Sequence, residues 1–246
     1  MYIKSKFFDV KVSNSVNDIR LAQTLRSKIF RNSEHNLDKD DFDRICKHIL
    51  IFDKKNNNKV ICVFRVLILP NGNKIQTSYS AQFYDLEKLK KISEPLLELG
   101  RFCVDPEYSN PNILRVAWCI LAKLINKHRV GFLFGCSSFP GVDASSYHEA
   151  FIFLRENHLA PKSLRPEIKS KNIFHYSREF SLRNVNKIAA IKSLPPLLRY
   201  YLTLGGWVSD HAVKDPDLNT LHVFTGLKIQ SIPLRKKEIF NSILLD

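Results

Sequence analysis

A helix set between two apolar strands, within residues 96–136, constrains the fold more than any other stretch of the chain. From Ile113 to Leu124 the apolar residues recur at helical spacing, which predicts a helix over residues 112–127. Continuous apolar runs at 96–104 and 129–136 flank it and predict two buried strands. A strand, a helix and a strand in this order predict a parallel crossover unit, so the protein contains a sheet with at least one helical layer.

The rest of the chain predicts a further mixture of helices and strands. We expect strands at 7–12, 48–52, 59–69, 207–209, 213–214 and 221–225, and helices at 15–31, 86–92, 144–156 and 188–204, the last with a break at Pro195-Pro196. In the helix at 15–31, the predicted buried stripe is Val16, Ile19, Ala22, Leu25 and Ile29. The basic, Pro-containing stretch 157–174 has no clear period and predicts a surface loop or lid. No internal repeat and no clean linker interrupts the sequence, so we expect a single α+β domain.

Composition and charge exclude several classes of protein. Of the 246 residues, 44% are hydrophobic, which excludes a disordered chain. No apolar run reaches the roughly 18 residues that cross a bilayer, and the first nine residues contain no long apolar stretch. We therefore expect a cytoplasmic protein, with peripheral contact to the inner face of the membrane. The five cysteines have neither disulfide-framework nor zinc-site spacing, and we expect no metal.

A net charge of +14 predicts an acidic partner. Three classes fit this charge: nucleic acid, anionic lipid head groups and an acidic carrier protein. The basic residues are scattered in pairs and triplets, with a looser group at Lys162, Arg165, Lys169 and Lys171. No zinc-finger or RNP-type motif accompanies them, so we expect no nucleic acid.

A few charged residues are set among apolar neighbours. Glu98 and Arg101 lie three apart on the predicted strand 96–104, so their side chains point to opposite faces unless Gly100 allows a bulge that redirects one of them. Arg26, Asp40, Asp43 and Arg65 are the other such residues. Each alone is typical of a structural ion pair. Together they predict a cleft with both signs of charge, which suits a zwitterionic or amino-acid-like substrate.

Other catalytic signatures are absent from the sequence. It contains neither a G-x-x-x-x-G-K-S/T loop nor a G-x-G-x-x-G motif, and the histidines lack metal-ligand spacing. Gly135-Cys-Ser-Ser-Phe139 lacks the flanking glycines of a nucleophile elbow. We therefore expect no resident cofactor.

Glu98-Leu-Gly-Arg101 is one of several segments whose order resembles the ornithine N-acyltransferase family. The others are residues 25–30, 41–50, 63–67, 135–139, 194–206 and 212–215. The resemblance covers roughly residues 20–226. It implies an α+β, GNAT-like three-layer fold, in which helices flank a mixed, splayed central sheet. A single domain over 1–246 would consist of a core at about 10–160 and a C-terminal extension at about 161–246.

The resemblance also implies a reaction, which is transfer of a (3-hydroxy)fatty acyl group from acyl carrier protein to the α-amine of ornithine, giving lyso-ornithine lipid. The donor would be the phosphopantetheine thioester of the acidic carrier, because residues 105–112 contain no glycine for a coenzyme A loop. Glu98 would be the catalytic base. Arg26, Asp40, Asp43, Arg65 and Arg101 match the charged positions that line the family's cleft. The strands at 96–104 and 130–137 would splay, and backbone N–H groups at the bulge would stabilise the oxyanion.

Three positions depart from the family's pattern. Cys62 stands in place of Gly, Ser109 in place of Arg, and His222 in place of Asp. These departures leave two other readings open. One is a related enzyme with a different acceptor, such as an N-acyl amino acid or acyl-homoserine-lactone synthase. The other is a non-catalytic basic protein that binds membrane or nucleic acid.

Overall fold

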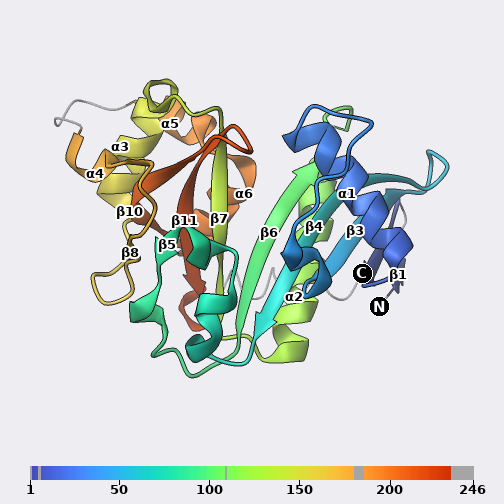
Figure 1. Ribbon diagram of the computed structural model, residues 1–246, viewed down its shortest axis with the longest axis horizontal. Helices are drawn as coiled ribbons and strands as arrows, with labels where there is room; N and C mark the ends of the chain where they lie inside the picture. The colour runs from blue at the N-terminus through green and yellow to red at the C-terminus, as the bar shows by residue number, and fades with distance from the viewer. Residues whose placement is uncertain (1, 5–6, 109, 180–185, 234–246) are drawn as a thin grey trace. The chain divides into compact units, whose positions relative to one another are not determined.

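The computed structural model describes residues 2–4, 7–108, 110–179 and 186–233, and these divide into two compact units (Figure 1). The first unit comprises the chain up to Ile68 together with Leu97–Arg129. The second comprises Leu69–Leu96 and the chain from Val130 onward. The single acyltransferase domain expected over 1–246 stays a prediction. Ser109 and the end of the expected C-terminal extension lie outside the described residues.

The first unit contains a run of neighbouring strands in the order β1-β2-β3-β4-β6. Their bounds are Tyr2–Lys4 for β1, Phe8–Ser13 for β2, Lys47–Asp53 for β3, Lys59–Leu69 for β4 and Leu96–Val104 for β6. The strands predicted at 48–52 and 59–69 are confirmed as β3 and β4, which pair antiparallel as a hairpin. Asn57 and Asn58 in its turn take positive φ values of 46° and 53°, a conformation that asparagine tolerates better than most residues.

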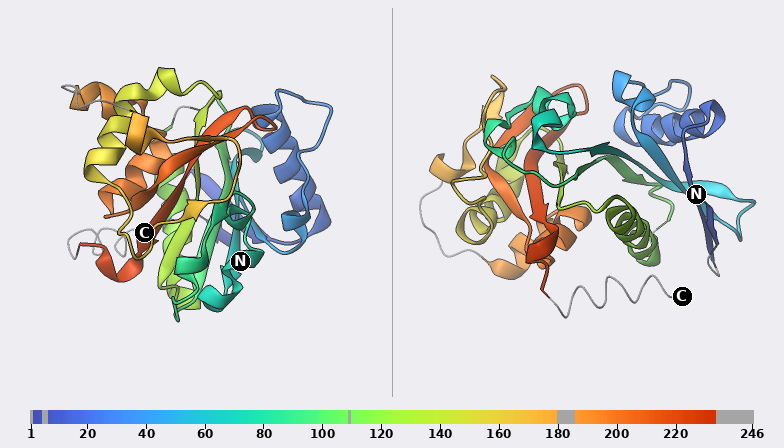
Figure 2. Two further views of the ribbon diagram at one scale, coloured as in Figure 1. Left: turned by 60° about the vertical axis from the view of Figure 1, so that its left-hand side comes forward. Right: turned by 90° about the horizontal axis from the view of Figure 1, so that it is seen from below.

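Two helices cover opposite faces of these strands, α1 (Val16–Phe30) and α2 (Asn112–His128) (Figure 2). The Ser15 hydroxyl caps α1 by accepting a hydrogen bond from the backbone N–H of Asp18. Ala22 and Leu25 pack on Leu50 and neighbouring residues, as the stripe predicted.

The same prediction is wrong for Val16, which is 81% exposed because the first turn of α1 lies outside this apolar cluster. The helix instead buries the polar residues Gln23, Arg26 and Ser27.

The second unit pairs its strands antiparallel in the order β7-β11-β10-β9. Their bounds are Phe132–Pro140 for β7, Thr220–Lys228 for β11, Trp207–Asp215 for β10 and Ile173–Phe174 for β9. A separate short pair joins β5 (Tyr84–Asp85) to β8 (Glu167–Ile168). The helices are α3 (His148–Asn157), α4 (Tyr176–Glu179), α5 (Lys187–Ser193) and α6 (Pro196–Thr203). These helices pack on an apolar core that includes Phe139, Phe151 and Leu198.

Three sequence predictions need correction in the second unit. The strands expected at 207–209 and 213–214 are one strand, β10, whose register shifts between Val208 and Ala212. The strand expected at 129–136 begins three residues later, because Arg129 ends α2 with a left-handed backbone of φ 50°. The helix expected at 86–92 shortens to a 3₁₀ turn at Glu87–Leu89. Here the Ile92 carbonyl accepts a hydrogen bond from the Gly72 N–H, which takes the chain out of the helix.

Candidate active site

Six charged side chains of the first unit alternate in sign and close a ring of ion pairs, called the charged ring below. In order of contact its members are Arg26, Asp43, Arg65, Asp40, Arg101 and Asp38. The arginines come from α1, β4 and β6, and the aspartates come from the connection between α1 and β3. The ring therefore joins two strands, one helix and a loop of this unit.

Arg26 lies at the most buried side of the charged ring. Its Nε donates to Oδ2 of Asp38 at 2.8 Å, and its Nη1 donates to Oδ1 of Asp43 at 2.6 Å. The second oxygen of Asp43 accepts from Nε2 of Gln23 at 2.8 Å. The side chain of Arg26 is 1% exposed. A charge this deeply buried is stable only when it is paired and hydrogen-bonded, and every group described here meets that condition.

The opposite side of the charged ring reaches solvent. Nη1 of Arg65 donates to Asp43 at 2.7 Å, and its Nη2 donates to Asp40 at 2.6 Å. Arg101 donates to Asp38 at 3.1 Å and to Asp40 at 3.2 Å. Asp40 has 22% of its side chain exposed and Arg101 has 8%, so these two form the solvent edge.

The pKa values of two ring aspartates fall below the ordinary range. Burial by itself raises the pKa of Asp43, but hydrogen bonds and positive charge from Arg26, assisted by Gln23 and Arg65, lower it well below its usual value. For Asp38 the opposing effects are again burial, which raises the pKa, and the charges of Arg101 and Arg26, which lower it. Both carboxylates are ionised at neutral pH.

Because the folded pKa values are lowered, we expect the first unit to lose stability in acid. The contribution of Asp38 and Asp43 is fully present above the unfolded pKa of about 4 and is lost as the pH falls through the folded values. Of the two tryptophans, Trp118 lies in the first unit and Trp207 in the second. A Trp207→Phe variant therefore reports the first unit by fluorescence. Its urea midpoint should fall as the pH drops from about 4 toward about 2, and a constant midpoint across that range would contradict the expectation.

Glu98 lies in the same unit, on β6, and is 4% exposed. Three residues later in the same strand, Arg101 has a left-handed backbone of φ 52°. A Cβ built on Gly100 would lie 3.8 Å from Nε of Arg65, so Gly100 faces the charged ring. Arg101 also reaches the charged ring, through its hydrogen bonds to Asp38 and Asp40. The residue with the left-handed backbone is therefore Arg101 and not Gly100.

The thiol of Cys46 lies within the electric field of both Glu98 and the ring. Burial raises the pKa of Cys46 to about 12; Arg65 opposes this, and Glu98, Asp40 and Asp43 add to it. Cys46 therefore stays a neutral thiol and not a nucleophile.

The sequence analysis included five of the six ring members and missed Asp38 as a site residue. Asp38 is 0% exposed and also accepts from Nε of Arg31 at 2.9 Å. Its position two residues before Asp40, in the same acidic segment, was the available signal. His48 was missed as well. Its Nε2 donates to the backbone carbonyl of Asp43 at 3.0 Å. Burial lowers the pKa of the His48 imidazole.

Two of the departures from the family's pattern are described, and neither belongs to the charged ring. Cys62 is fully buried in β4, which raises its pKa well above the ordinary value. His222 lies in the second unit and is 2% exposed. Tyr84 donates its hydroxyl to the His222 backbone carbonyl at 2.7 Å.

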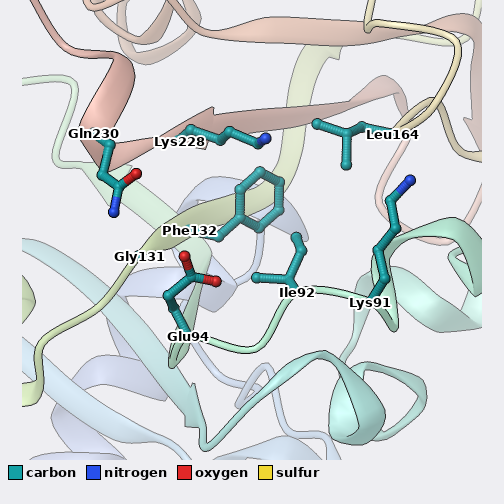
Figure 3. Close-up of a pocket in the computed structure, with 8 residues that line it drawn as sticks. All are labelled: Lys91, Ile92, Glu94, Gly131, Phe132, Leu164, Lys228 and Gln230. Carbon is teal, nitrogen blue, oxygen red and sulfur yellow. The ribbon is translucent and has the colours of Figure 1, made fainter.

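A small cavity of about 170 Å³ in the second unit holds none of the predicted site residues (Figure 3). Phe132 and Ile92 line it together with Lys91 and Glu94. Gly131 borders it, and a Cβ there would lie 2.5 Å from the Cβ of Glu94, so only glycine allows this close approach.

Among the described residues, no helix is long and apolar enough to cross a membrane. In the same part of the chain, no group of three or more His, Cys, Asp or Glu could hold a metal ion.

Comparisons with known proteins show the family to which the chain belongs. The acetyltransferase (GNAT) domain family matches residues 24–119. An L-ornithine N(alpha)-acyltransferase of Brucella abortus is 30% identical over 245 residues, which cover 92% of this chain and 86% of the relative. The L-ornithine N(alpha)-acyltransferase of Rhodobacter capsulatus is 28% identical over 247 residues, which cover 95% of this chain and 94% of the relative. The solved structure of FeeM, an N-acyl amino acid synthase from uncultured soil microbes, shares the fold at a TM-score of 0.52 and 9% identity, covering 94% of this chain and 97% of that one. The chain therefore has a GNAT-like fold and belongs to the family of L-ornithine N(alpha)-acyltransferases.

Proposed function

We propose that the protein transfers a fatty acyl group, 3-hydroxylated in the preferred donor, from the thioester of acyl carrier protein to the α-amine of ornithine. One observation carries this proposal. The GNAT match at residues 24–119 contains Glu98 and all six members of the charged ring, which one compact unit brings together. The reaction needs a base near a site with both signs of charge, and this unit offers both.

Glu98 is the base in this mechanism. Its carboxylate takes a proton from the α-ammonium of ornithine, directly or through a water molecule, and the neutral amine attacks the thioester carbonyl. The C–N bond forms and the C–S bond then breaks. The thiolate leaves and takes the second proton of the nitrogen. A backbone N–H of β6 near the left-handed Arg101 stabilises the oxyanion of the tetrahedral intermediate.

The charged ring has two tasks in this proposal. It holds the left-handed backbone of Arg101, a conformation that costs on the order of 1–3 kcal/mol and persists only when its surroundings fix it. Its solvent edge, formed by Asp40 and Arg101, offers one negative and one positive group to an amino acid that carries both charges. The solvent edge is held in place by the ion pairs of Arg26, Asp43 and Arg65. These three residues act on the substrate only by positioning Asp40 and Arg101.

The charge of the chain suits the proposed partners. A net charge of +14 increases the rate of encounter with an acidic carrier protein, and it also favours brief contact with an anionic membrane that accepts the acylated product. The segment after β6 contains no glycine-rich phosphate loop, which favours the carrier-bound donor over coenzyme A. The proposal requires no resident cofactor, since the thioester itself supplies the activated acyl group.

The test is a mass-spectrometric assay of the purified full-length protein with 3-hydroxyacyl carrier protein and an equimolar mixture of the twenty amino acids and ornithine. We expect N-acylornithine to be the dominant product. If another acyl-amino acid dominates, the proposed acceptor is wrong and the proposed acyl transfer stands. Absence of every acyl-amino acid would overturn the proposal and favour a non-catalytic binding protein.

A further inference from the structure

A groove of about 550 Å³ in the second unit is lined by four basic side chains. Lys88 comes from the 3₁₀ turn beside β5, Lys162 and Arg165 from the connection between α3 and β8, and Arg178 from α4 (Figure 1). Two of them, Lys162 and Arg165, belong to the loose basic group noted in the sequence. That group takes no part in the charged ring. The fold therefore gathers cations from three separate segments around one concave surface.

The acidic side chains of the groove are already engaged. Glu167 pairs with Nζ of Lys88 at 2.8 Å. Asp210 accepts from Nδ1 of His211 at 2.8 Å and lies 3.7 Å from Nη1 of Arg165. Among the described residues, Lys162 and Arg178 form no ion pair, and both are exposed. Four cations against two carboxylates leave an excess of positive charge directed at solvent.

Part of the groove's lining is held in place by contacts within the second unit. Nε and Nη2 of Arg165 both donate to the carbonyl of Ala160, at 3.1 Å and 2.9 Å. Nζ of Lys169 donates to the carbonyl of Ala81 at 2.6 Å, and Ile168 pairs with Tyr84 between β8 and β5. These contacts attach the segment expected to be a loop or lid to the strand β5 and to the chain after α3. A preorganised surface pays less ordering entropy when it binds.

The lining of the groove distinguishes between the classes of acidic partner. Among the described residues that line it, His175 is the one aromatic ring and no Phe, Tyr or Trp is present, so it lacks the row of stacking aromatics typical of single-stranded nucleic acid sites. A membrane-binding surface would present a broad apolar face, whereas the exposed large aliphatic residue here is Ile168, at 45% exposure, on the wall of a concavity. Arginine and a little apolar surface within a charged rim are typical of a protein interface.

We propose that this groove docks an acidic surface of the acyl carrier protein that delivers the donor. The inference rests on the proposed function, because that function supplies an acidic protein partner. Lys162 and Arg178 contact carboxylates of the carrier. Arg165 is held by the Ala160 carbonyl and therefore presents its positive charge to the carrier in a fixed orientation.

The experiment compares two double variants of equal net charge. Lys162→Glu/Arg178→Glu changes the groove, and Lys187→Glu/Lys192→Glu changes exposed lysines of α5 in the same unit. Each is assayed with acyl carrier protein as donor and with the same acyl group on pantetheine, which lacks the carrier. The groove variant should raise the KM for acyl carrier protein at least about tenfold, because like charges now face each other. Its kinetics with acyl-pantetheine should stay within twofold of wild type.

The control variant should stay within twofold of wild type with both donors. An unchanged KM in the groove variant, or an equal rise in both double variants, would overturn the docking site. Loss of binding to phosphatidylglycerol vesicles with an unchanged KM would also overturn it and assign the groove to the membrane. If wild type makes no product with either donor, the proposed function fails. Anisotropy of fluorescently labelled holo carrier protein then decides the groove separately, because docking requires tighter binding by wild type than by the groove variant.

Discussion

Replacing Glu98 by glutamine is expected to lower kcat for acyl transfer to ornithine by about 10²- to 10⁴-fold, the usual contribution of a general base. Glutamine keeps the size and much of the hydrogen bonding of the side chain but cannot take the proton of the ammonium. The carboxylate is 4% exposed on β6, so bulk buffer does not replace it readily. The measurement is initial rate against ornithine concentration at saturating acyl carrier protein.

The matched control is Glu107→Gln in the same unit. The Glu107 side chain is 63% exposed and pairs at the surface with Lys59. This variant should keep kcat within twofold of wild type. If Glu98→Gln also keeps kcat within threefold while Glu107→Gln is normal, Glu98 is not the base, and the role of this buried carboxylate is structural.

Replacing Arg26 by methionine is expected to destabilise the first unit by about 3–5 kcal/mol, the usual cost of removing one partner of a buried ion pair. Methionine fills a similar volume, but it leaves Asp38 and Asp43 without the guanidinium that now contacts both. Both carboxylates must then either stay charged in a buried site or take up protons. The measurement is urea unfolding in the Trp207→Phe background, in which Trp118 reports this unit.

Lys28→Met, two residues further along α1, is the control for this change. Lys28 is 31% exposed and lies 3.7 Å from both Asp105 and Glu107. A partly exposed pair at this distance contributes about 0–1 kcal/mol. An Arg26→Met variant that loses no more stability than Lys28→Met would show that the charged ring does not stabilise the first unit.

Local patterns were sufficient to predict most elements of both units. The apolar spacing between Ile113 and Leu124 predicted α2 because a helix repeats its buried face every 3.6 residues. The strands β3 and β4 were predictable as apolar runs, and the asparagines between them suit a turn because asparagine tolerates the left-handed backbone. The order of the matching segments along the chain predicted the family, which the comparisons confirm. Each of these features can be recognised along the chain without its tertiary contacts.

The charged ring depends instead on residues far apart in the sequence. The contact between Arg26 and Asp38 spans 12 residues, and the one between Arg101 and Asp38 spans 63. Whether an isolated Asp is a surface charge or a fully buried acceptor is decided by what packs around it, so Asp38 went unrecognised. The same reason explains Val16, whose helical spacing was correct but whose turn lies outside the apolar cluster.

The sequence by itself predicted most of the helices and strands, the family and five of the six charged residues of the ring, because periodicity, turn residues and motif order can be recognised along the chain. Only the tertiary structure decided that three arginines and three aspartates close into a ring, that Arg101 takes a left-handed backbone inside β6, and that Lys162, Arg165 and Arg178 meet at one groove. Each of these outcomes depends on burial and charge pairing between distant segments, and those energies exist only once the chain has folded.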